Sequence, residues 1–250
     1  MRALVKPKRT AIKVLLFSAL LAATTFAWAG QVAGTVVHLS GPLLAKKADG
    51  SIKVLARKSE VEQGDTLVAE KGTYAQIRFI DNSEITLKPD TTFKIDSFAY
   101  DEGKPDADSA SFSLVKGGLR SVTGLLGKRN EAKFALKTPT ATIGIRGTTF
   151  IAQFVGPGVA RGAAPGLQPG LHVQVVDGMI VLSNSGGSQN FAAGQFGFVP
   201  SMSQAPVIVP NNPGLQFTPP PAFNSTPVAV ADGGPGAIAS SKGEVDCTVR

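Results

Sequence analysis

Two glycines enclose a single arginine in the segment ALKTPTATIGIRGTTFIAQ, residues 135–153. Arg146 lies between Gly144 and Gly147, and β-branched residues flank this group on both sides. Such a cation could bind an anion or a partner carboxylate in a concave stretch of backbone. The alternative is structural, because glycines allow a bulge and a guanidinium can donate to carbonyls that a corner leaves unpaired. We favour the structural interpretation, in which Gly144 and Gly147 form a turn that Arg146 holds in place.

The strongest charge asymmetry of the chain lies in the same region. Residues 116–146 contain one acid, Glu131, and seven cations: Lys116, Arg120, Lys128, Arg129, Lys133, Lys137 and Arg146. Period-two spacing places Lys133 and Lys137 on one side of a strand. These cations form either a solvated sheet face or a docking surface for an acidic protein or anionic polymer. Salt screening would limit the reach of such a surface to about 10 Å.

Other residue types that carry chemistry lack the required spacing. The acidic loop with Asp101, Glu102, Asp106 and Asp108 has neither the glycine nor the final glutamate of a calcium loop, so we expect it to be solvated. A serine nucleophile in a G-x-S-x-G turn is absent from the sequence, and no pair of carboxylates stands out. We therefore predict that the chain is not an enzyme.

The histidines and the cysteine do not suggest a metal site either. His38 and His172 are far apart in the sequence, and Cys247, the single cysteine, is four residues from the end. A zinc site of the usual type needs several such ligands at short spacing. We expect no metal and no cofactor.

The elements that must position these residues are strands. In TYAQIRFIDNSEITLKPDTTFKI, residues 73–95, apolar and polar side chains alternate with a period of two. The turn signal Asp81-Asn82-Ser83 interrupts it, because Asn tolerates a left-handed backbone. Similar turn signals recur every eight to twelve residues. The sequence predicts an all-β fold of many short strands, either solenoid-like or sandwich-like.

Two terminal segments differ from this pattern. Residues 1–13 carry five cations and no acid, residues 14–27 are largely apolar, and Ala27-Trp28-Ala29 resembles a signal-peptidase site. We predict a signal peptide over residues 1–29, with an uncleaved anchor as the alternative. Cleavage would lower the net charge from +7 to +2, which argues against nucleic-acid binding. The β domain would then span residues 30–199.

Residues 200–250 form the second such segment. They are rich in proline and glycine, with few charges and little periodicity. Such a composition buries too little apolar surface to fold by itself, so we predict an extended or disordered tail. The segment at 155–170 is also rich in glycine and proline, and it reads as a flexible excursion.

The order of these motifs resembles the FecR domain, a periplasmic module. Gly64-Asp65-Thr66-Leu67 is similar to its "G-D-x-L" turn. Its most specific signature, "TP…RGT.F", is similar to Thr138-Pro139 followed by Arg146-Gly147-Thr148-x-Phe150, and the resemblance covers roughly residues 34–199. Asn82 departs from it, since the family commonly has glycine there.

The resemblance implies a role in the bacterial envelope. Regulatory members have a cytoplasmic domain that binds a sigma factor, followed by a membrane span. Here only residues 1–13 precede the apolar segment, so we expect no direct sigma-factor contact and no membrane span in the mature chain. We expect an exported docking module, in the periplasm or at the cell surface, that recognises an envelope or secreted protein or an anionic polymer. The alternative is a structural component of a secreted or surface assembly.

Overall fold

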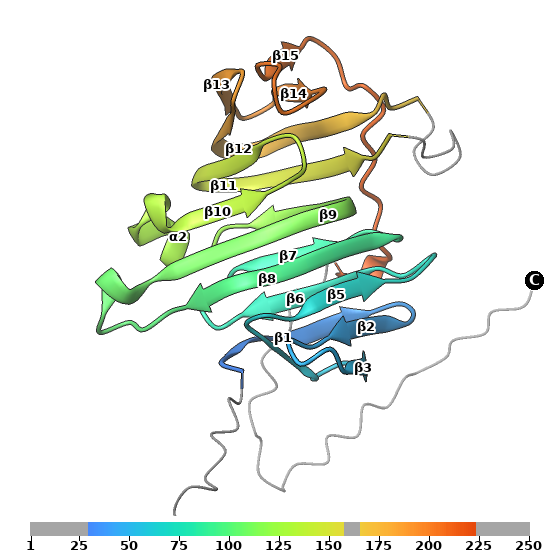
Figure 1. Ribbon diagram of the computed structural model, residues 1–250, viewed down its shortest axis with the longest axis vertical. Coiled ribbons are helices and arrows are strands. Elements are labelled where there is room, and N and C mark those ends of the chain that lie inside the picture. The colour runs from blue at the N-terminus through green and yellow to red at the C-terminus, as the bar shows by residue number, and fades with distance from the viewer. Residues whose placement is uncertain (1–29, 158–165, 224–250) are drawn as a thin grey trace, which may run out of the picture.

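The computed structural model describes residues 30–157 and 166–223 of the chain (Figure 1). The predicted signal peptide with Ala27 and Ala29, residues 158–165 of the 155–170 excursion, and Cys247 lie outside the described residues. Within them, no helix has the length and hydropathy of a membrane span.

The described chain is built almost entirely of strands. They are β1 (Val32–Leu39), β2 (Leu43–Lys46), β3 (Ile52–Leu55), β4 (Glu60–Glu62), β5 (Thr66–Ala69), β6 (Ala75–Phe79), β7 (Glu84–Leu87), β8 (Thr91–Ala99), β9 (Ser109–Val122), β10 (Phe134–Lys137), β11 (Thr142–Val155), β12 (Gly170–Asn184), β13 (Gly187–Ala192), β14 (Phe196–Val199) and β15 (Val207–Val209). The helical elements are short: η1 (Pro105–Ala107), α2 (Leu125–Arg129), η2 (Glu131–Lys133) and η3 (Pro221–Phe223).

The strands belong to one hydrogen-bonded sheet that folds into two layers. The first layer has the order β3, β2, β5, β8, β9, β10, β11, β12, β13. The second has the order β4, β1, β6, β7, β9, β11, β12, β14, β15. Of these pairs, β9 and β10 are parallel and the others antiparallel. Each of the three long strands β9, β11 and β12 thus has one half in the first layer and the other half in the second. Together the two layers form one continuous stack of strands (Figure 1).

The long strands change layer where the backbone is left-handed. Gly147 in β11 has φ +59°, and the β11–β12 register shifts between Arg146 and Thr149. Gly178 in β12 has φ +76°, and a Cβ there would collide with the Gly147 carbonyl oxygen. Since L-residues pay a steric penalty in this region, glycine is required at the point where the two strands cross together.

The core lies between the two layers. Phe79 of β6 packs against Phe98 of β8 and Phe112 of β9, with ring centroids 4.9 and 5.1 Å apart. Phe93 of β8 stacks on Phe112 at 5.4 Å. Because β6 is not hydrogen-bonded to β8, and meets β9 only through β7, these rings join the layers face to face. Buried aromatic side chains of this size supply much of the apolar area that holds such a fold together.

The predicted fold class is confirmed. Ala75, Ile77 and Phe79 are buried on the inner face of β6, as the period of two requires. Asn82 has φ +61° in the β6–β7 turn, which agrees with the left-handed conformation expected there. The fold resembles a sandwich because it has two packed layers. It resembles a solenoid because successive strands are added along the same direction in both layers.

The chain beyond the predicted boundary at residue 199 stays packed for another 24 residues. It forms β15 and then a strap, residues 210–223, which descends along one side of the stack in orange to red (Figure 1). Leu215 is 4% exposed and Phe223 8% exposed. The strap is extended, but its apolar side chains are packed against the body, which the proline-rich composition did not predict. Residues 224–250 lie outside the described residues.

Candidate recognition surfaces

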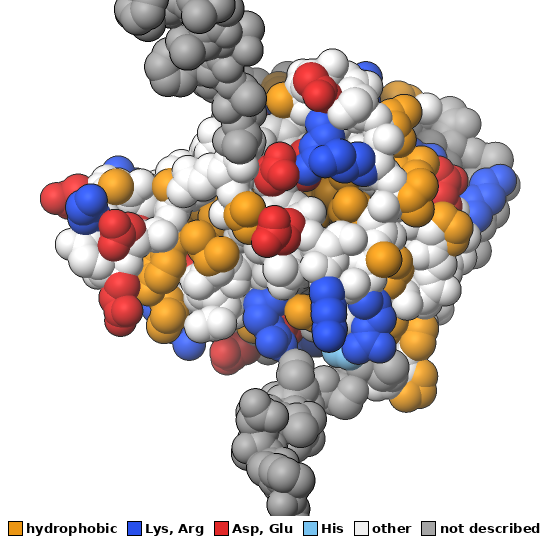
Figure 2. All heavy atoms as spheres, turned by 90° about the horizontal axis from the view of Figure 1, so that it is seen from below, with side chains coloured by type: hydrophobic (Ala, Val, Ile, Leu, Met, Phe, Trp, Pro, Cys, Tyr) orange, Lys and Arg blue, Asp and Glu red, His pale blue; other side chains and the backbone are white. Residues whose placement is uncertain are grey.

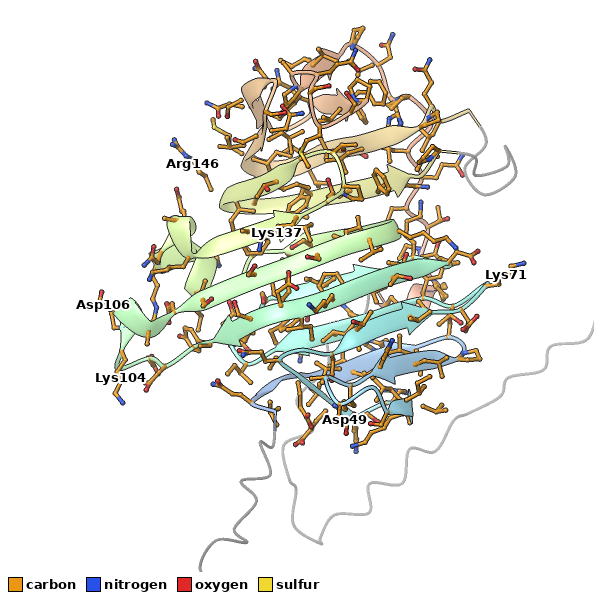
Figure 3. All side chains as sticks on the ribbon, in the orientation of Figure 1. Asp49, Lys71, Lys104, Asp106, Lys137 and Arg146 are labelled. Carbon is orange, nitrogen blue, oxygen red and sulfur yellow. The ribbon has the colours of Figure 1, made fainter. Side chains whose placement is uncertain are left out.

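The motif around Arg146 forms the bulge where β11 changes layer. Arg146 does not hold it: its side chain is 60% exposed, projects away from the stack (Figure 3) and lies 3.7 Å from Glu131. Thr148 does so instead, because its hydroxyl donates to the Met179 carbonyl at 2.6 Å and accepts from the Arg146 N–H at 3.1 Å. The predicted role of Arg146 is therefore wrong. The short Thr148 side chain places its hydroxyl beside the unpaired backbone groups of the bulge. The longer Arg146 side chain extends past these groups into solvent.

The other motif residues have mainly structural positions. Gly144 is in regular extended pairing with Val181 and has no left-handed φ, so only Gly147 shapes the bulge. Thr138 closes the β10–β11 turn around the exposed Pro139, since its hydroxyl donates to the Ala141 carbonyl at 2.8 Å. Phe150 is fully buried. The signature thus maps to a fold-defining crossing, with no ligand-binding geometry.

The seven predicted cations do not form one surface. Arg129 pairs with Asp108 at 2.6 Å and Lys133 donates to the Asp106 carbonyl at 3.1 Å, so both tie down the acidic loop. Lys116 lies 4.0 Å from Asp90, while Lys128 is exposed on α2. Arg120 belongs to the half of β9 that lies in the second layer. Lys137 belongs to β10 in the first layer, and Figure 3 shows Lys137 well apart from Arg146. A single basic docking face over residues 116–146 is therefore not present.

The acidic loop and the histidines are also accounted for by contacts within the fold. Asp108 is buried against Arg129, and in the described residues no three His, Cys, Asp or Glu side chains are placed to hold a metal ion. His38 binds the Gln76 side chain at 2.7 Å on the second layer. His172 stacks on Phe198 at 4.6 Å, nearer the other end of that layer.

The strand β3 is the most exposed edge of the stack. Within residues 30–157 and 166–223 it pairs with β2 alone. Ile52 is 67% exposed and Val54 76% exposed, the highest values among the large hydrophobic residues described. An exposed apolar edge strand is a template for pairing with another chain.

The backbone of β3 also faces outward at these two residues. Lys47 donates its N–H to the Ser51 carbonyl at 2.8 Å, which makes Lys47–Ser51 a hydrogen-bonded pair of the β2–β3 hairpin. Hydrogen-bonded and open pairs alternate along an antiparallel ladder. Ile52 and Val54 therefore lie in non-hydrogen-bonded pairs with β2. Their N–H and carbonyl groups point away from β2 and can bond another strand.

Cations surround this edge. Residues 46–58 contain one acid, Asp49, and five cations: Lys46, Lys47, Lys53, Arg57 and Lys58. All but Lys47 are exposed. Figure 2, which views this end of the stack, shows Lys and Arg side chains gathered near a histidine at its margin and Asp and Glu side chains nearer its centre. We call Ile52, Val54 and the four exposed cations the β3 edge.

The remaining cation of this group is neutralised. Lys47 lies 2.8 Å from Asp65 and 3.2 Å from Glu62. Burial lowers the pKa of Lys47, but its hydrogen bonds with Asp65 and Glu62 outweigh this effect and the pKa is raised. Lys47 therefore fixes the β2–β3 hairpin to the β4–β5 turn. Of the four exposed cations, Arg57 donates its Nε–H to the Val37 carbonyl at 3.2 Å.

Residues 65–180 match the model of the FecR protein family. The chain contains a FecR domain. The match runs from the start of β5 into β12 and includes the crossing at Gly147 and Gly178. It confirms the resemblance found in the sequence motifs, over a shorter span than the predicted 34–199. The β3 edge and the strap both lie outside the matched part.

The FecR-domain chain has distant neighbours among solved structures. Two crystal structures of a candidate anti-sigma factor from Parabacteroides distasonis ATCC 8503 align with a TM-score of 0.44, at 12% and 14% identity. In each case 58% of this chain covers 58% of the other. A cell surface anchoring domain aligns over 25% of this chain with a TM-score of 0.25 and 21% identity. No curated protein matches the chain.

The sequence held a signal for the β3 edge that motif reasoning missed. Five cations and one acid in thirteen residues, around the alternating segment Ile52–Leu55, are as uneven as the 116–146 region. What the sequence could not show is that, among the described strands, β3 has one neighbour while β9 and β11 have several. Exposure of an apolar strand is a property of topology, not of composition.

Proposed function

We propose that this FecR-domain chain is a non-catalytic, exported recognition module of the bacterial envelope that binds an extended segment of a protein partner along β3. The open edge of β3 carries the proposal. Strand addition obtains its affinity from main-chain hydrogen bonds and its specificity from alternate side chains. Here the outward N–H and carbonyl groups of Ile52 and Val54 would supply the affinity, and their exposed side chains would contribute to the specificity.

The charges around the edge define the partner's chemistry. Lys53 stands between the two apolar residues and points to the opposite face of the strand, the face on which Leu55 is buried. A lysine at this position disfavours pairing with an identical edge, since the two cations would meet. A partner strand that alternates apolar and acidic side chains would satisfy both Lys53 and the neighbouring Lys46, Arg57 and Lys58.

A protein partner fits this edge better than an anionic polymer. A polymer without a peptide backbone could use the four exposed cations but would leave the open N–H and carbonyl groups of β3 unpaired. Export is supported by the cationic, apolar and small-residue order of residues 1–29. Non-catalytic action is consistent with the way charged groups such as Asp108 and Asp65 are used in ion pairs that hold loops.

The test uses a proline that blocks the edge but not the fold. Val54→Pro removes an N–H that faces away from β2, and edge strands tolerate proline at such positions. Val54→Thr keeps this N–H and the β-branched shape, so it is the matched control. We expect wild type and Val54→Thr to retain the same envelope protein from extract in a quantitative pull-down, and Val54→Pro to lose at least tenfold of it.

Salt and charge supply a second arm of the experiment. Lys53→Glu should also reduce recovery of that protein, and 0.5 M salt should weaken the wild-type interaction because exposed charges are screened. Equal recovery with Val54→Pro, or no specific protein at low or high salt, would refute the proposal.

A structural role is the second candidate, and the other end of the stack favours it. There β15 pairs with β14 alone within the described residues, and Val207 and Ile208 are exposed. Two open ends could join head to tail into a filament. Concentration-dependent growth in light scattering, without any partner and abolished by Val54→Pro, would support assembly over partner recognition.

A further inference from the structure

The strap lies in a groove across the outer face of the second layer. The groove floor is formed by residues within or directly beside successive strands: Phe198, His172, Gln153, Lys88, Tyr74 and His38. Register pairs place His172 beside both Phe198 and Gln153, and Gln153 beside Gly118. The strap therefore runs across the strands, and it cannot join their ladders.

Aromatic contacts seat the lower half of the strap. Phe217 meets the Tyr74 ring edge-on at 6.2 Å. Phe223 contacts Tyr74 at 6.2 Å and His38 at 5.5 Å. Between the two phenylalanines are Pro219, Pro220 and Pro221, which favour an extended chain with little conformational freedom. Proline-rich segments with such anchors are a recurrent ligand of aromatic-lined grooves.

Few polar contacts hold the strap to the body. Among the hydrogen bonds of the described residues, one joins the two: Lys88 Nζ donates to the Gln216 carbonyl at 2.8 Å. Asn212 instead bonds within the strap, where its side chain accepts from the Gly214 and Leu215 N–H groups. A segment without ladder hydrogen bonds can leave without opening the sheet, so it belongs to the least stable part of the fold.

The strap also leaves the groove incompletely filled. A hollow of about 200 Å³ lies where Tyr74 and Lys88 contact the strap, and its lining also includes Asp90, Lys116, Gly118 and Gln153. Gly118 opens this hollow, since a Cβ there would meet the Lys88 side chain at 3.0 Å. A second hollow of about 260 Å³ is lined by His172 and Phe198 of the body and by Pro213 of the strap. A ligand with larger side chains could make contacts that the strap does not.

Lys88 gives the first hollow a chemical preference. Its ammonium is hydrogen-bonded to two neutral oxygens, the Gln153 side chain at 2.5 Å and the Gln216 carbonyl. No carboxylate pairs with it among the described residues. Burial lowers the pKa of Lys88. Asp90, which also lines the hollow, lies 4.0 Å from Lys116 and is not paired with Lys88, so an acidic side chain of a ligand would supply the missing counter-charge.

We propose that this groove is a second binding site, which takes an extended, proline-rich segment of a partner protein with aromatic side chains and an acceptor for Lys88. The strap occupies it as an intramolecular ligand. A second copy of the chain is a poor competitor, because a tethered strap has an effective concentration of about 1 mM and an identical strap binds no more tightly. A partner segment that fills the two hollows can displace it. This site is separate from the β3 edge.

The test measures binding of a labelled synthetic peptide with the sequence of residues 212–223 to the full chain by fluorescence anisotropy. Phe217→Ala/Phe223→Ala loosens the strap and should bind the peptide at least tenfold more tightly than wild type, whose own strap competes. Adding Tyr74→Ala should weaken this binding at least tenfold. Adding Val115→Ala, an exposed position on β9, should not change it.

Two outcomes would overturn the proposal. One is absence of saturable peptide binding to the loosened chain when its circular dichroism matches that of wild type. The other is equal binding when Tyr74 is replaced. Wild-type hydrogen exchange gives an answer even if the loosened chain misfolds: strap amides as protected as those of β11 would contradict an exchangeable strap. Micromolar dimerisation that requires Phe217 and Phe223 would assign the groove to a second copy instead.

Discussion

Arg129 grips Asp108 through two hydrogen bonds of 2.6 Å, from Nε to Oδ2 and from Nη2 to Oδ1. The guanidinium also donates to the carbonyls of Asp101 and Glu102 and lies 4.5 Å from the centre of the Tyr100 ring. The Asp108 side chain is fully buried. This relationship connects α2 to the acidic loop, and it turns a residue that the sequence suggested as a docking cation into a structural clamp.

Replacing Arg129 by Gln should destabilise the fold, because it leaves the Asp108 carboxylate buried without its partner. We expect a lower urea midpoint than for Lys128→Gln, which changes the exposed neighbouring cation. Equal midpoints for the two variants would show that the clamp contributes nothing.

The same pair predicts a pH dependence. The hydrogen bonds from Arg129 hold the pKa of Asp108 below its ordinary value of 3.8, although burial opposes this shift. A carboxyl whose pKa is lower in the folded state stabilises the fold above its unfolded pKa, and this contribution disappears as the pH falls through the folded value. The difference between wild type and Arg129→Gln should therefore be complete at pH 6 and shrink below about pH 4.

Thr148→Val tests which side chain holds the β11 bulge. Valine has the same shape but cannot bond the Arg146 N–H or the Met179 carbonyl. Leaving these backbone groups unsatisfied should cost about 1–3 kcal/mol in the free energy of unfolding. Arg146→Gln, at an exposed position, should change it by less than about 0.5 kcal/mol. The reverse order would restore Arg146 as the holding residue.

Gly178→Ala and Gly144→Ala separate required from incidental glycines. At Gly178 the left-handed backbone costs an alanine about 1–2 kcal/mol, and its Cβ would also meet the Gly147 carbonyl. At Gly144 the nearest atom to an added Cβ is 3.9 Å away. Chemical denaturation should show a large loss for the first variant and a change within about 0.5 kcal/mol for the second.

The sequence predicted what depends on local pattern. Alternation identified the buried face of β6, and the tolerance of asparagine for φ above zero located the turn at Asn82. These features depend on a few neighbouring residues and on one repeating period. The FecR signature was likewise readable, because it reflects the crossing between layers.

What the sequence could not give depends on which strands meet. Nothing in the spacing of Arg129 and Asp108, twenty-one residues apart, indicates that they pair. The strap is a similar case: its proline-rich composition predicts an extended or disordered chain, but the groove that receives Phe223 is assembled from residues as distant as His38 and Tyr74. Exposure of Ile52 and Val54 follows from the place of β3 at the end of the stack.

His172 should make the fold sensitive to mild acid. Its Nε2 lies 2.8 Å from the Gln168 carbonyl, and its buried Nδ1 has no partner in the described residues. Burial lowers the pKa of His172, against a smaller opposing effect of the Gln168 carbonyl. The folded state thus takes up its proton at a lower pH than the unfolded chain, so stability is full above the unfolded pKa of about 6.5 and falls as the pH decreases below it. His172→Phe keeps a ring that can stack on Phe198 but cannot titrate. Between pH 7.5 and pH 5 we expect the urea midpoint of wild type to fall further than that of His172→Phe, since the carboxylates contribute equally to both chains. Parallel pH profiles would contradict the assigned role of His172.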